Sequence, residues 1–217
     1  MKKSLLGIAA LLLLANPALA HHPLAGQPME TFTHGLLSGV GHPLLGFDHL
    51  FFVIAVGIAA VFTGYARSAP AAYIVAMLVG CLIMSFGIGL PLKEVIIGLS
   101  LLVVGGAVLS GQALSLPVAL TLFAGFGIFH GSAFGDSIAA QEAGVGGSVL
   151  IGYLIGLGVL QYLIAIVSGW VVKTLFNATE ASAINARLAG AIITGVGLFL
   201  TMENVEGFAL TAAGLAG

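Results

Sequence analysis

Runs of apolar residues dominate the chain, and short polar breaks separate them. A helix needs about 20 apolar residues to cross the hydrocarbon core of a bilayer, so each run is long enough to form a span. Only 6% of the 217 residues are charged, whereas a water-soluble domain of this size carries about a quarter. The sequence therefore predicts an all-α, polytopic integral membrane protein whose surface contacts membrane lipid.

We expect about six transmembrane helices, all within one domain. The breaks between the runs contain Gly, Pro or charged residues, as in TGYARSAP around Arg67 and LPLKE around Pro91. Glycines recur inside the runs, and small residues allow helices to pack closely in lipid. The expected spans lie near 42–62, 70–90, 94–111, 116–135, 148–172 and 184–203.

The first twenty residues have the pattern of a cleaved signal peptide. Two lysines follow the initiator Met, residues 5–14 form an apolar core, and Ala-Leu-Ala at 18–20 is a small-x-small cleavage site. Cleavage makes residues 21–217 the mature domain, which begins at His21. The alternative is an uncleaved first transmembrane helix, although the apolar core is short for a span.

A cleaved signal peptide places the mature N-terminus on the periplasmic side of the cytoplasmic membrane. With six spans the C-terminus lies on the same side, and basic residues should collect on the other side. On the expected inside are Arg67, Lys173 and Arg187; on the expected outside are Asp136, Glu142, Glu203 and Glu206, with Lys93 as the exception. The net charge of −2 and the lack of a basic run indicate no nucleic-acid partner. The oligomeric state stays open, and a homo-oligomer is compatible with the sequence.

Ionisable side chains occur at the start of the first expected span, in the stretch GHPLLGFDHLFF. Such side chains cost several kcal/mol in hydrocarbon unless they are paired or hydrated, so each is a functional candidate. His42 and His49 are seven residues apart, which on a straight helix separates them by about 10 Å. Two imidazoles that far apart cannot bind one ion unaided, and Asp48 is turned about a quarter of a circle away from them. Either the helix is broken between them, which Pro43 and Gly46 favour, or each needs ligands from elsewhere.

A second polar cluster, FHGSAFGDS, ends the fourth expected span and contains His130 and Asp136. In the expected orientation His130 lies at a depth similar to the first cluster, and His21, His22 and His34 lie on the same side. Imidazoles with one or two carboxylates suit nickel, copper, zinc or cobalt rather than calcium or magnesium. The plainer alternatives are helix-capping, interfacial or carbonyl-bonded histidines and an ordinary loop aspartate.

Two motifs give the chain a resemblance to a known family. HPLLGFDH fits the pattern H-x5-D-H, and FHGSAFG resembles F-H-G-x-A-x-G-x-E; both are found in the HupE/UreJ family of nickel and cobalt permeases. The resemblance implies that the metal-handling residues are His42, Asp48, His49 and His130. One position departs from it, because Ser137 stands where the second motif ends in glutamate. Either Asp136 supplies that carboxylate or a hydroxyl replaces it.

The resemblance implies a secondary permease that brings Ni²⁺, with Co²⁺ as second choice, inward for metalloenzyme assembly. The ion is then cargo, and neither an enzymatic activity nor a bound cofactor is expected. There is no G-x-x-x-x-G-K-[ST] motif for ATP, so the membrane potential, an ion gradient or a partner must drive transport. The alternatives are an intramembrane zinc hydrolase, although H-E-x-x-H and G-x-S-x-G are missing, and a membrane protein that binds metal without transporting it.

Overall fold

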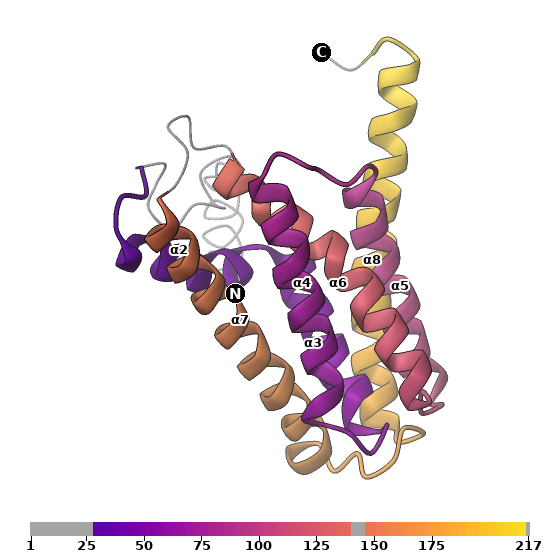
Figure 1. Ribbon diagram of the computed structural model, residues 1–217. Coiled ribbons are helices and arrows are strands. Elements are labelled where there is room, and N and C mark those ends of the chain that lie inside the picture. Colours follow the sequence, from indigo (N-terminus) through magenta and orange to yellow (C-terminus); the bar gives the residue numbers. More distant parts are fainter. Residues whose placement is uncertain (1–27, 140–145, 216–217) are drawn as a thin grey trace, which may run out of the picture.

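The computed structural model describes residues 28–139 and 146–215, and these residues form helices without any strand. Figure 1 shows the helices as one bundle. They are α2 (Phe32–Leu45), α3 (Phe47–Val61), α4 (Ser68–Ser85), α5 (Lys93–Ser110), α6 (Leu116–Ala139), α7 (Gly147–Trp170), the π-helix η1 (Val171–Leu175) and α8 (Ile184–Ala212). The predicted signal peptide and its cleavage site lie outside the described residues.

Five helices, α4 to α8, are long and apolar enough to cross a membrane, with η1 continuing α7. The pair α2 and α3 passes the same test together but is bent by 82°. The prediction of an all-α polytopic membrane protein is therefore confirmed, with five spans, or six if the bent pair counts as one. The last helix continues past residue 203, where the apolar run ends, and its C-terminal part extends beyond the other helices (Figure 1).

Gly46 produces the break between α2 and α3. It has an extended backbone, with φ −89° and ψ 98°, and its N–H donates to the carbonyl of His42 at 3.0 Å. The next helix begins at once, and Asp48 in its first turn favours that helix because a carboxylate stabilises the positive end of the helix dipole. Of the two alternatives considered for this segment, the structure has the broken helix.

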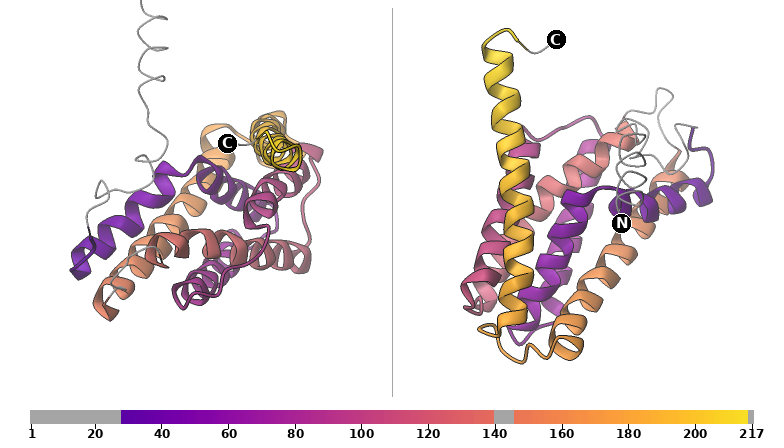
Figure 2. Two further views of the ribbon diagram at one scale, coloured as in Figure 1. Left: turned by 90° about the horizontal axis from the view of Figure 1, so that it is seen from above. Right: turned by 180° about the vertical axis from the view of Figure 1, so that it is seen from behind.

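Glycines set the closest helix contacts. A Cβ added to Gly131 on α6 would lie 1.9 Å from the backbone oxygen of Met77 on α4, and one added to Gly39 on α2 would lie 2.2 Å from the backbone oxygen of Tyr153 on α7. Seen from above, α2 lies beside the first part of α7 (Figure 2). In lipid, burial of apolar surface does not favour helix association, so van der Waals contact at these close approaches stabilises the bundle instead.

The connections divide between the two ends of the bundle. In Figure 1 the 86–92 connection lies at the upper end and the α2–α3 break lies below it in the upper half, whereas the connections 62–67, 111–115 and 176–183 lie at the lower end. We call these the break end and the loop end. The first turn of α3 and the second half of α6 therefore both lie toward the break end, as the alternation of spans predicts.

Candidate functional site

Two of the predicted site histidines touch each other inside the bundle. His49, in the first turn of α3, and His130, on α6, have their Nδ1 atoms 2.8 Å apart. Their side chains are nearly inaccessible, with residue exposures of 5% and 0%. Aromatic rings pack against the pair. Phe52 stacks on His130 with ring centroids 4.2 Å apart, and the ring centroid of Phe134 lies 4.1 Å from that of His49. The two polar clusters seen in the sequence therefore contact each other through these histidines.

Ser100 on α5 determines which nitrogens of this pair carry protons. Its hydroxyl donates to the carbonyl of Ile97 at 2.6 Å, and its oxygen lies 2.9 Å from Nε2 of His130. Because a hydroxyl has one proton, the Ser100 oxygen accepts from the Nε2–H of His130. A neutral His130 then presents the lone pair of Nδ1, and His49 donates its Nδ1–H to it.

His42 lies beside the pair without joining it. Its ring centroid is 6.4 Å from that of His49, and its Nδ1 lies 3.1 Å from the hydroxyl of Tyr153 on α7. That hydroxyl donates to the carbonyl of Phe134 at 2.9 Å, so its oxygen accepts from His42. His42 is half-buried, so it is more accessible than the two buried histidines.

Asp48 places a carboxylate next to the histidine pair. Its Oδ2 lies 3.8 Å from Nε2 of His49, and its side chain is 24% exposed. This distance is beyond hydrogen-bond range, but it keeps an anionic group close to the site. A cation that reaches His49 would therefore be partly neutralised by Asp48.

The remaining predicted ligands are not gathered at this site. His34, near the start of α2, accepts a hydrogen bond from the N–H of Glu30 at 3.3 Å, and eight residues of helix place it about 12 Å from His42 along the axis. Asp136 pairs with Lys93 on α5. His21 and His22 lie outside the described residues. Within residues 28–139 and 146–215, no three His, Cys, Asp or Glu side chains form a group that could hold one metal ion.

Ser137 and Asp136 have different surroundings. The hydroxyl of Ser137 lies 3.1 Å from that of Tyr153, which contacts His42. Asp136 instead points to the ammonium group of Lys93. Ser137, which stands where the family motif has glutamate, thus belongs to the hydrogen-bond network around His42. The carboxylate of Asp136 does not.

Several polar residues of this region were missed in the sequence. They are Ser100, Tyr153 and the members of a fully buried network on α4 and α7. In this network Tyr73 donates to the amide oxygen of Gln161, and the Gln161 amide contacts the Met77 sulfur at 3.7 Å. The ring of Tyr73 lies 6.1 Å from that of His130. The signal was available, since a glutamine or serine inside an apolar run needs a partner.

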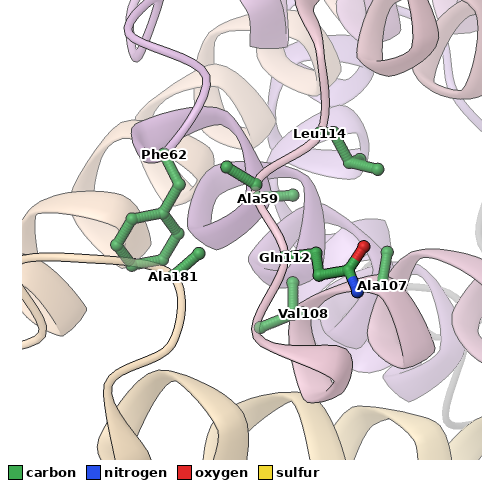
Figure 3. Close-up of a pocket in the computed structure, with 8 residues that line it drawn as sticks. Ala59, Phe62, Ala107, Val108, Gln112, Leu114 and Ala181 are labelled. Carbon is green, nitrogen blue, oxygen red and sulfur yellow. The ribbon is translucent and has the colours of Figure 1, made fainter.

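A small pocket lies at the loop end, and no histidine lines it (Figure 3). It is lined by Ala59, Phe62, Ala107, Val108, Gln112, Ala113, Leu114 and Ala181. Its volume of about 10 Å³ holds at most one water molecule. We therefore attribute it to imperfect packing where three connections meet.

Fold and site together define a polytopic membrane protein with a buried histidine pair between a broken helix and α6. Residues 9–200 match the family model described as HupE / UreJ protein, and the chain belongs to this family. It is similar to Protein HupE of Rhizobium leguminosarum bv. viciae, with 27% identity over 189 residues that cover 86% of this chain and 92% of that protein. No solved structure matches the chain. The resemblance seen in the two motifs is confirmed.

Proposed function

We propose that this protein is a secondary permease that carries divalent nickel, with cobalt as a second substrate, across the cytoplasmic membrane from the periplasmic side. The observation that carries the proposal is the contact of 2.8 Å between the two buried imidazoles of His49 and His130. Ionisable side chains inside a membrane domain are costly and mark ion pathways. Imidazole nitrogen is a ligand that nickel and cobalt accept well.

The proposed route runs from the break end to the histidine pair. His42 is half-buried and Asp48 is partly exposed, so an ion meets both before it reaches the buried nitrogens. At the pair the ion competes with the proton that His49 donates to His130, because a metal needs a lone pair on the nitrogen. Metal binding at this contact is therefore expected to displace a proton or to change the tautomer.

The membrane potential is sufficient to drive a dication inward. Each charge gains about 2.3 kcal/mol per 100 mV, so two charges gain about 4.6 kcal/mol. This gain corresponds to more than three powers of ten in the ratio of inside to outside concentration. The proposed transport needs no bound nucleotide.

The test is radioactive nickel uptake by proteoliposomes with an imposed inside-negative potential, with cobalt and zinc as competitors. His49→Gln and His130→Gln are expected to abolish uptake at every nickel concentration. His34→Gln is the matched comparison, because it removes an imidazole that lies outside the contact. It is expected to lower uptake only at low nickel concentration, as a collecting residue would. Equal and mild effects of all three changes would refute the proposed pathway.

Binding without flux would assign a different role. If the purified protein bound nickel but proteoliposomes accumulated none under either sign of the potential, the protein would be a membrane metal-binding protein. Preference for zinc over both nickel and cobalt in the competition would overturn the proposed cargo and leave the route intact.

A further inference from the structure

Two basic side chains near the loop end form no ion pair with the acidic residues that the structure describes. Of the six Lys and Arg residues, Lys2 and Lys3 precede the described part of the chain. Lys93 pairs with Asp136, and Arg187 donates from Nε to the carbonyl of Leu109 at 3.0 Å. The other two, Arg67 and Lys173, form no ion pair with any described acidic residue.

These two cations line the same pocket. It has a volume of about 260 Å³ and lies between the α3–α4 connection, which carries Arg67, and the end of α7 with η1, which carries Lys173. Its other walls are mainly apolar: Val61, Ala66, Ile166, Gly169, Trp170 and Thr174. The pocket therefore combines two basic residues with mainly apolar walls.

The backbone segments that carry both cations are joined to α7. The hydroxyl of Tyr162 on α7 donates to the carbonyl of Arg67 at 3.0 Å, which ties the α3–α4 connection to α7. Lys173 lies in the π-helix, whose wider turn is often found at functional positions. Trp170 is 55% exposed and directly precedes this turn. An exposed tryptophan next to basic residues at the end of a span is typical of the membrane–water interface.

We propose that this pocket binds the phosphate group of an anionic phospholipid from the leaflet at the loop end. Two cations that pair with no described acidic residue attract an anion, and a basic pocket between spans is a known site for anionic headgroups. The apolar walls favour a lipid over a free phosphate ion, because a free ion gains nothing from them.

The size of the pocket fits one end of a lipid. A volume of about 260 Å³ equals roughly nine water molecules at about 30 Å³ each, which is enough for a headgroup and too little for a whole phospholipid. The acyl chains would then follow the outer face of α7, where Leu163 and Val167 are 53% and 52% exposed. The proposal does not depend on which ion the protein carries.

The experiment measures lipid binding to the full-length protein purified in a non-ionic detergent, by native mass spectrometry with phosphatidylglycerol and phosphatidylcholine. Each basic residue near an anionic lipid contributes about a fivefold gain in affinity. The double variant Arg67→Gln/Lys173→Gln is therefore expected to bind phosphatidylglycerol about 25-fold more weakly. Phosphatidylcholine should bind the unchanged protein more weakly than phosphatidylglycerol and should be affected little by the double change.

Two further variants complete the design. Arg187→Gln removes one positive charge from the same end of the molecule but outside the pocket, and it should bind phosphatidylglycerol like the parent. Arg67→Lys/Lys173→Arg keeps both charges and should retain binding, which separates loss of charge from loss of fold. The proposal fails if the double glutamine variant binds like the parent, or if Arg187→Gln is equally impaired. Displacement of phosphatidylglycerol by millimolar inorganic phosphate would show a free-anion site and would overturn the assignment to lipid.

Discussion

The contact between α4 and α6 can be tested with one methyl group. Gly131 follows His130 directly, and a Cβ there would lie 1.9 Å from the backbone oxygen and 2.7 Å from the carbonyl carbon of Met77. Cβ atoms essentially never approach other atoms closer than 3.0 Å, so the helices must separate by about 1 Å. The obstacle is backbone, which cannot rotate away. We therefore take about 3 kcal/mol for the overpacking and subtract about 1 kcal/mol for the better helix propensity of alanine. Gly131→Ala should lower the free energy of unfolding by about 2 kcal/mol.

The matched control is Gly125→Ala on the same helix, where an added Cβ has no atom within 4 Å. The two changes share the propensity gain, so their difference of about 3 kcal/mol isolates the clash. The assay is equilibrium unfolding in mixed detergent micelles with increasing SDS, followed by far-UV circular dichroism. We also expect lower nickel uptake by Gly131→Ala alone, because the separation shifts the part of α6 that carries His130. Equal stability of the two variants would refute the close contact and the register of α4 on α6.

Four more predictions concern the site and the orientation. Ser100→Ala removes the acceptor of the buried His130 Nε2–H and should lower the free energy of unfolding by about 1–3 kcal/mol, measured in the same micelles; an unchanged value would contradict the assigned proton positions. Asp48→Asn should keep the fold but reduce nickel uptake sharply, because it removes the carboxylate beside His49; parental uptake would exclude this role. Uptake should fall as the outside pH is lowered, because protons compete with the metal for the imidazole nitrogens; uptake that does not depend on outside pH would argue against histidine ligands. A tag placed after Gly217 should be cleaved by external protease in intact spheroplasts, and protection would indicate an odd number of spans in the mature chain.

The membrane fold could be predicted because bilayer thickness fixes the length of an apolar run. The break in the first span was also predictable, since Pro43 and Gly46 lie between the two histidines and weaken a continuous helix there. Alternation of the spans placed His49 and His130 at the same end. Their contact confirms that part of the reasoning. All of these inferences depend on position along the chain rather than on which helix faces meet.

The partners of the polar residues could not be predicted, because they depend on helix rotation. Ser100 lies in the middle of an apolar run and bonds to a residue 30 positions away. Lys93 looks neutralised by the adjacent Glu94 in the sequence, yet it pairs with Asp136 on another helix. Such pairings follow from the glycine contacts that set the register of each helix pair, and the glycine spacing alone is compatible with several registers.

The same polar residues help to specify how the helices are arranged. Apolar side chains distinguish poorly between a neighbouring helix and a lipid chain, so hydrogen bonds and close backbone contacts decide which faces meet. Four hydrogen bonds between buried or half-buried side chains join different helices. They connect His49 on α3 with His130 on α6, His130 with Ser100 on α5, His42 on α2 with Tyr153 on α7, and Tyr73 on α4 with Gln161 on α7. A substitution at the histidine pair therefore changes both the proposed ion pathway and the contact between α3 and α6. For this reason, loss of uptake identifies an ion ligand only when the same variant keeps its free energy of unfolding.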